Sequence, residues 1–175
     1  MIPFTREVYI DADDFSDNPP PKFFRMKPEG EVRLMGAYIV KCNEIIKNED
    51  GTVKEIHCTA DLETRNNNPA DGRKIKGTIH WLSSAHALDT KVMLYDFLFD
   101  IENTSDIPED KTYDDYLNKS SVNKIECAKV EPSLADASAG ERFQFVRCGY
   151  FVKDTKHENT FNRIVGLKDS FPAKK

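Results

Sequence analysis

Apolar and polar residues alternate with a period of two in several stretches of this sequence. The alternation is clearest over Val53–Leu62, and it is the pattern of a strand with one buried face. Another strand-like run, Ala37–Ile46, precedes it across a short polar loop that contains Asp50-Gly51. An Asp-Gly pair between two such runs is a strong hairpin signal. The two runs therefore predict an antiparallel hairpin.

The rest of the chain continues in short segments separated by turn residues. Further strands are expected over Ile75–Leu82, Ser121–Val130, Glu141–Lys153 and Phe161–Leu167, a loop over Arg65–Gly72, and short helical pieces within Tyr113–Ser121 and Leu134–Ala139. The apolar run Lys91–Phe99 fits a buried strand or a short helix equally well. Many short strands at this spacing favour an all-β sandwich or barrel over alternating strands and helices.

Composition narrows the class of protein. The chain has 175 residues, of which 39% are hydrophobic, and its 11 Phe, 6 Tyr and 1 Trp argue against disorder. No apolar run approaches the roughly 20 residues that a membrane-spanning helix needs, and the N-terminus lacks the pattern of a signal peptide. We therefore expect a cytoplasmic protein without a membrane segment.

Charge is distributed unevenly along the chain. The net charge is −5, yet the stretch Asp96–Asp115 alone carries eight acidic residues and one lysine, Lys111. By contrast, Arg65–Lys91 holds five basic residues against two acidic ones. A local basic surface, of the kind that binds nucleic acid, is therefore available despite the acidic total.

The sequence lacks the common motifs of catalytic and metal sites. It has no phosphate-binding glycine loop, and its four cysteines are too widely spaced for a zinc site. We expect no catalytic residue, no bound metal and no disulfide. A small hydrolase that uses Cys148 with a distant histidine stays open as one alternative.

Several stretches together resemble the C-terminal anticodon-binding region of glutaminyl-tRNA synthetases. They follow the family's order along nearly the whole chain. One of them is Pro69–Leu82, within which the block from Pro69 to Trp81 is specific to the family. The other stretches are Pro3–Ile10, Glu31–Leu34, His86–Leu88, Leu94–Asp96, Glu131–Leu134, Phe143–Phe145 with Arg147, Gly149–Phe151, Phe161–Arg163 and Val165–Leu167.

The resemblance implies an all-β fold of two consecutive β-barrels, like that of ribosomal protein L25, with short helices in the connections. We place the first barrel in residues 1–100, an acidic linker in 101–111 and the second barrel in 112–171. Residues 3–10 are a further candidate strand for closing the second barrel. The family's catalytic Rossmann domain, with its HIGH-like and MSK-like motifs, is absent from this sequence.

The resemblance also implies a function. The parent enzyme would join glutamine to tRNA-Gln with ATP and magnesium, and this chain would bind the CUG and UUG anticodons without a cofactor of its own. Its expected partners are tRNA-Gln and the catalytic domain of the same enzyme, in a monomer. Two alternatives stay open beside the hydrolase: the same region of a glutamyl enzyme, and a free-standing RNA-binding barrel.

Three residues match the family's pocket for the middle uridine of the anticodon. Gln144 carries an amide that suits uracil, because both offer a donor and an acceptor. Arg25 and Arg147 match the arginines of the same pocket. Gln144 and Arg147 are three residues apart, so they reach one pocket only if the strand bulges or ends near Arg147.

Three other basic residues, Arg73, Lys74 and Lys76, are expected to contact the RNA backbone. Such contacts give affinity but no sequence readout. Where the family has arginines near Leu94–Asp96, this sequence has Met93 and Phe97. We therefore transfer no contact to the outer anticodon bases there.

Overall fold

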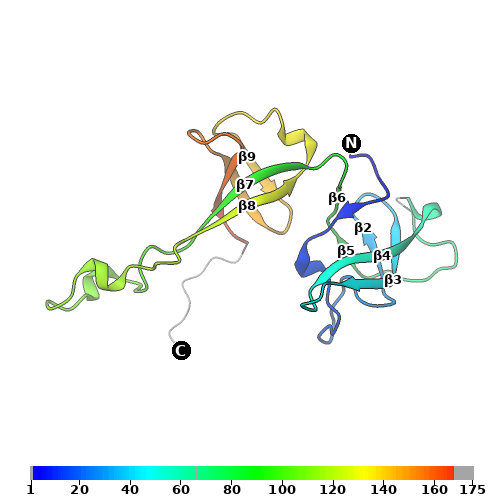
Figure 1. Ribbon diagram of the computed structural model, residues 1–175, viewed down its shortest axis with the longest axis horizontal. Coiled ribbons are helices and arrows are strands. Elements are labelled where there is room, and N and C mark those ends of the chain that lie inside the picture. Colours follow the sequence, from blue (N-terminus) through cyan, green and yellow to red (C-terminus); the bar gives the residue numbers. More distant parts are fainter. Residues whose placement is uncertain (1, 66, 168–175) are drawn as a thin grey trace. The chain divides into compact units, whose positions relative to one another are not determined.

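The computed structural model describes residues 2–65 and 67–167, and the chain divides into two compact units, Met1–His86 and Ala87–Lys175. Figure 1 shows the strands of both units. The helices within the described residues are 3-10 helices of three or four residues. The all-β prediction is therefore confirmed.

In the described part of the first unit, six strands form two sheets. The strands are β1 (Val8–Tyr9), β2 (Glu31–Leu34), β3 (Ile39–Lys47), β4 (Val53–Asp61), β5 (Thr78–Ile79) and β6 (Leu82–Ser83). Four of them form a sheet in the order β4-β3-β2-β5, and β1 pairs with β6. The predicted hairpin is confirmed, because β3 and β4 pair antiparallel along their length.

The segment predicted as one strand over Ile75–Leu82 is only partly a strand. It forms β5 and β6, and Trp81 between them is 6% exposed. The indole N–H of Trp81 donates to the carbonyl oxygen of Met35 at 2.9 Å. This bond satisfies the polar atom of a ring that belongs to the core of the unit.

The second unit, as far as residue 167, is built on one five-stranded sheet. Its strands are β7 (Leu88–Tyr95), β8 (Val122–Val130), β9 (Arg142–Phe145), β10 (Gly149–Lys153) and β11 (Thr160–Val165). They lie in the order β8-β7-β11-β10-β9. The ambiguous segment at Lys91–Phe99 is therefore largely a strand, paired on one edge with β8 and, in parallel, with β11 on the other.

The core of the second unit is made of aromatic rings on one face of this sheet. Phe151 and Phe161 are 3% and 1% exposed, and Phe143 and Phe145 pack against them. The rings of Phe145 and Phe151 stack with centroids 4.4 Å apart, and Phe143 meets Phe161 edge-on at 5.8 Å. These four rings pack together with the buried side chain of Val92, and aromatic rings bury large apolar areas.

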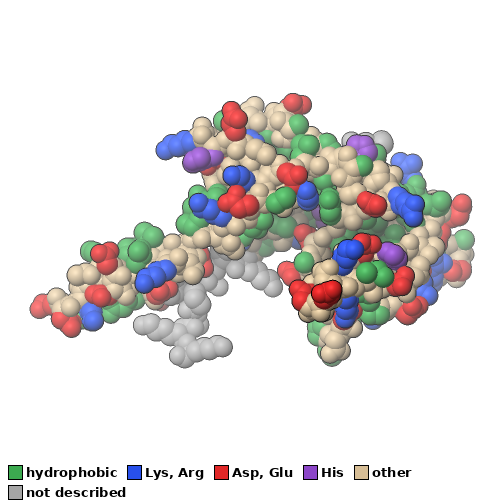
Figure 2. Space-filling model, viewed as in Figure 1, with side chains coloured by type: hydrophobic (Ala, Val, Ile, Leu, Met, Phe, Trp, Pro, Cys, Tyr) green, Lys and Arg blue, Asp and Glu red, His purple; other side chains and the backbone are tan. Residues whose placement is uncertain are grey.

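The acidic stretch is an extension of the β7–β8 hairpin. Beyond the paired strands, the backbone N–H of Asp96 donates to Ser121, and that of Asp100 donates to Tyr116. We call residues 96–121 the arm; it is the green to yellow-green segment of Figure 1. Acidic and hydrophobic side chains lie side by side along it in Figure 2.

The compact units divide the chain elsewhere than the predicted boundaries. Leu88–Tyr95 lies in the second unit, because its parallel pairing with β11 joins it to the C-terminal strands. Residues 3–10 supply β1, which pairs with β6 and so belongs to the first unit. Residues 168–171 of the predicted second barrel lie outside the described residues. In those described, the sheets are open, and none closes on itself through strand pairing.

Replacing Gly77 by alanine is expected to destabilise the first unit. A Cβ atom at Gly77 would lie 2.2 Å from the carbonyl oxygen of Phe24, which is backbone and cannot turn aside. Overpacking of this kind costs about 1–3 kcal/mol, and urea unfolding measures it. Gly30→Ala is a milder comparison, because its Cβ atom would lie 2.7 Å from Cγ and 3.1 Å from the carbonyl oxygen of Lys27, both longer than the contact at Gly77. An equal loss of stability in both variants would contradict the close approach at Gly77.

Candidate nucleic-acid interface

The β9–β10 hairpin determines where Gln144 and Arg147 lie. The sequence predicted a single strand over Glu141–Lys153, but the chain turns back after Phe145. The backbone N–H of Cys148 donates to the carbonyl oxygen of Phe145 at 2.9 Å and closes this turn. The strand that carries Gln144 therefore ends before Arg147. This is one of the two conditions that the three-residue spacing required.

Gln144 faces solvent because its neighbours face the core. Phe143 and Phe145 on either side of it pack into the aromatic cluster, and successive side chains of a strand point to opposite faces. Gln144 is exposed, and its amide makes no hydrogen bond with another described residue. An unpaired amide offers one acceptor and two donors to a ligand.

Arg147 occupies the turn in a conformation that favours glycine. Its φ is 69°, in the left-handed region, where an L-residue with a side chain is disfavoured. Gly149 follows with a φ of 134°, and a Cβ atom there would lie 2.6 Å from the carbonyl oxygen of Val165. The hairpin thus has glycine where β11 approaches most closely, and an arginine at its tip.

Arg25 is anchored in the first unit by backbone and carboxylate. Its Nη1 atom donates to the carbonyl oxygen of Asp13 at 2.8 Å and lies 3.4 Å from Oδ1 of Asp14. The Asp14 side chain is fully buried, whereas that of Arg25 is 40% exposed. Arg25 therefore helps to neutralise a buried charge while part of its side chain stays exposed to solvent.

Arg73 is surrounded by carboxylates of its own unit. Its two Nη atoms lie 2.6 Å from Asp61 and 2.5 Å from Asp71, and its Nε lies 3.2 Å from Glu31. Hydrogen bonds to Asp61 and then to Asp71 raise the pKa of Arg73. Because both Nη atoms donate to carboxylates within the protein, a phosphate would have to compete for them. The contact of Arg73 with RNA stays a prediction.

Lys74 and Lys76 are exposed, whereas Arg73 is half-buried. Neither makes an ion pair with a described residue. The Nζ atom of Lys76 lies 5.4 Å from the centroid of the Phe24 ring, which is itself 50% exposed. Phe24 precedes Arg25, so the structure brings Lys76 close to the chain segment of Arg25. Lys74 and Lys76 keep their charge available for a phosphate.

The residues predicted for the uridine pocket are distributed over both units. Gln144 and Arg147 lie together on one hairpin of the second unit, whereas Arg25 lies in the first. Their convergence on one uridine stays a prediction, as do the roles assigned to each of them.

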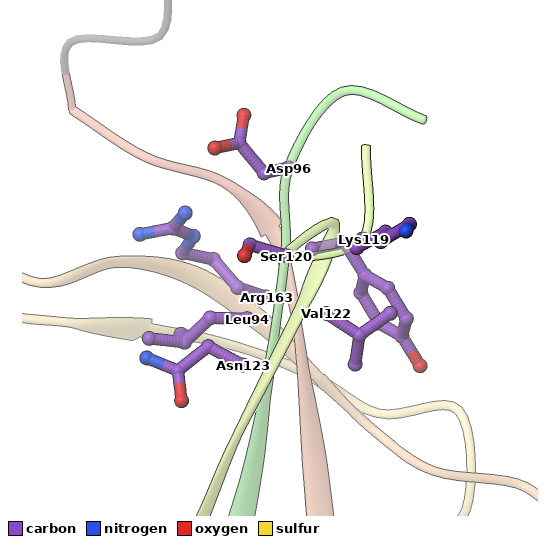
Figure 3. A pocket seen from close by; sticks show the side chains of 8 residues that line it. Leu94, Asp96, Lys119, Ser120, Val122, Asn123 and Arg163 are labelled. Carbon is purple, nitrogen blue, oxygen red and sulfur yellow. The ribbon is translucent and has the colours of Figure 1, made fainter. Parts of the chain in front are cut away.

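A groove that the sequence did not indicate lies where the arm meets the sheet. It has a volume of about 560 Å³. Its lining consists of Leu94, Tyr95, Asp96, Lys119, Ser120, Val122, Asn123 and Arg163. Figure 3 shows Arg163 and Asp96 extending to one side of it and Lys119 to the other. Arg163 belongs to a stretch that resembles the family, Phe161–Arg163. Lys119 is distant from it in sequence, and no sequence pattern indicated that the two residues line one groove.

The described residues contain neither a membrane-spanning helix nor a metal-binding cluster. No helix there has the length and apolar character needed to cross a membrane. No group of three or more His, Cys, Asp or Glu side chains in this part of the chain is placed to hold a metal ion.

Comparison with known families decides the class of the chain. Two family models match it, over residues 1–61 and 78–154, and both describe the anticodon-binding domain of class I tRNA synthetases (E and Q). The chain belongs to this family. Gln144, Arg147 and Arg25 of this anticodon-binding chain lie within the matched ranges, whereas Arg73, Lys74 and Lys76 lie between them.

Curated relatives of this anticodon-binding chain carry the name glutamine–tRNA ligase. The protein of Rhodopirellula baltica is 46% identical, over 97% of this chain and 29% of its own length. The protein of Neisseria meningitidis is 47% identical over 99% of this chain and 32% of its own length. That of Pseudomonas putida is 42% identical over 98% of this chain and 31% of its own length. The chain thus spans about three tenths of the length of these relatives.

The tip of the β9–β10 hairpin gives a test of the backbone geometry. Arg147→Gly relieves the left-handed strain that Arg147→Ala retains, and both variants lack the guanidinium. We expect the glycine variant to be more stable than the alanine variant by about 0.5–1 kcal/mol, measured by urea unfolding. An alanine variant of equal or higher stability would contradict the left-handed conformation.

Proposed function

We propose that this chain reads the anticodon of tRNA-Gln as part of a glutamine–tRNA ligase. The observation that carries the proposal is the identity of 42–47% with enzymes of that name over almost the whole chain. In the complete enzyme, ATP and magnesium serve a catalytic domain elsewhere, and this chain needs no cofactor. We place the enzyme in the cytoplasm as a monomer whose catalytic domain and tRNA-Gln are the partners of this chain.

The proposed readout uses the outward face of the β9–β10 hairpin. Single-stranded loops are recognised by splaying bases out and bonding their Watson–Crick edges. The Gln144 amide can donate to a uracil oxygen and accept from its N3–H. Arg147, at the tip of the same hairpin, and Arg25 would supply charge-assisted bonds to the uracil oxygen or to a phosphate.

The proposed backbone contacts come from the first unit. Lys74 and Lys76 are exposed cations without an ion pair to a described residue. A phosphate contact requires a positive charge that the RNA backbone can reach, and both lysines provide one. The net charge of −5 does not oppose this, because residues 96–121 of the arm carry −6 and the rest of the chain carries +1. Lys76 lies over the ring of Phe24, and Arg25 is the next residue after Phe24. The partly exposed side chain of Arg25 would therefore belong to the same phosphate-binding surface as Lys76.

The proposal is tested by competition between anticodon stem-loops. Loops with CUG or UUG should displace a labelled CUG loop from the chain better than glutamate loops that end in UC. If glutamate loops competed as well, the chain would not select for glutamine. If no loop bound, the proposed function would fail altogether.

Gln144→Ala should reduce discrimination at the middle base. A good base contact is worth roughly 1–3 kcal/mol, so wild-type protein should bind a loop with a middle uridine about 5- to 150-fold more tightly than one with a middle cytidine. The variant should bring this ratio close to one, as measured by fluorescence anisotropy. An equal weakening for both loops would argue against readout by Gln144.

Lys74→Ala should weaken all loops alike. Loss of one phosphate contact to a single strand lowers the slope of log K against log salt by about 0.7, which binding titrations over a range of salt concentrations measure. Lys54→Ala is the control, because Lys54 is an exposed lysine of the same unit that already pairs with Glu55. The same change of slope in both variants would indicate a general charge effect rather than a contact.

A further inference from the structure

Tyr150 is the direct cross-strand partner of Gln144. In the register between β9 and β10, Gln144 pairs with Tyr150 and Phe143 with Phe151. Residues that lie opposite each other in an antiparallel pair share one face of the sheet. Since Phe143 and Phe151 belong to the aromatic core, the next pair along the strands, Gln144 and Tyr150, faces outward.

The ring of Tyr150 is available to a ligand. It is 44% exposed, and its hydroxyl makes no hydrogen bond with another described residue. On its other side, Tyr150 pairs with Val165 of β11, which is 42% exposed. The outward face thus holds an unpaired amide, an aromatic ring and an aliphatic side chain in one row across three strands.

This row has the two properties that recognition of an extruded base requires. An amide can read the Watson–Crick edge, but the base also loses its stacking partners when it leaves the loop. Stacking on an aromatic side chain restores roughly 1–3 kcal/mol per base. Directly opposed residues of an antiparallel pair have Cβ atoms about 4.5–5.5 Å apart, so one base can meet both side chains.

We propose that Tyr150 is the stacking platform for the base that Gln144 reads. This proposal rests on the proposed function and adds a specificity-determining residue to it. Val165 borders the platform and gives the face of the base an apolar surround. Phe143 and Phe145 cannot serve instead, because their rings are packed against Phe161 and Phe151.

The test combines variants of Tyr150 with a loop whose middle anticodon nucleotide is abasic. Tyr150→Ala should bind the intact CUG loop roughly 5- to 150-fold more weakly than wild type. Tyr150→Phe keeps the ring and should stay within about twofold. On the abasic loop, Tyr150→Ala and wild type should bind equally, because the stacked base is missing. Fluorescence anisotropy measures each affinity.

Two further variants separate stacking from a structural effect. Tyr150→Val replaces Tyr150→Ala if the alanine variant does not fold, because valine suits a strand. It should show the binding pattern expected of Tyr150→Ala: weaker binding of the intact loop and unchanged binding of the abasic loop. Tyr113→Ala removes a ring that is 60% exposed on the arm of the same unit, and it should bind both loops as wild type does.

The outcomes distinguish this inference from the function on which it rests. Suppose that wild type selects CUG loops and Gln144→Ala loses that selection, while Tyr150→Ala binds as wild type does. The proposed function then stands and the stacking role is overturned. A loss in Tyr150→Ala that persists on the abasic loop would also overturn it. If wild type shows no preference for CUG loops, both proposals fail.

Discussion

Burial of phenylalanine rings on one face of the β9–β10–β11 sheet decides what the second unit shows to solvent. Phe143, Phe145 and Phe151 alternate with polar or amphipathic residues, and each ring that enters the core turns its strand neighbours outward. A shift of register by one residue would exchange the two faces. The outward position of the Gln144 amide is thus a consequence of hydrophobic packing on the opposite side.

The first unit uses its basic residues in two different ways. Arg25 and Arg73 are held by the carboxylates of Asp14, Asp61 and Asp71, and they stabilise the loops in which they lie. Lys74 and Lys76 are left exposed. Arginine suits the structural positions because its planar group can bond several oxygens at once, whereas a lysine keeps a compact charge on a flexible stem.

Much of the fold could be predicted from the sequence, because strand alternation and the Asp-Gly turn are local signals. The β3–β4 hairpin and the all-β class followed from them. The split of Glu141–Lys153 into two strands did not, since Val146–Cys148 contains no glycine or proline and the turn depends on a left-handed arginine. The placement of β7 was also missed, because its parallel pairing with β11 is a long-range contact without a local pattern.

The candidate site was predictable only as far as residue identity goes. Gln144, Arg25 and Arg147 were chosen by their match to a family. No periodicity distinguishes Arg73, which carboxylates hold, from Lys74, which is exposed. Tyr150 was overlooked for a related reason. Its exposure depends on the cross-strand register, and the register is set only when both strands and the rings behind them are in place.

The parallel contact between β7 and β11 also affects how the chain folds during its synthesis. The hydroxyl of Thr90 donates to the carbonyl oxygen of Asn159, 69 residues further along. At a translation rate of about 5–20 residues per second, β7 waits roughly 3–14 s for this partner. Until then one edge of the β7–β8 ribbon lacks its neighbour, and the nascent second unit is open to association with other chains.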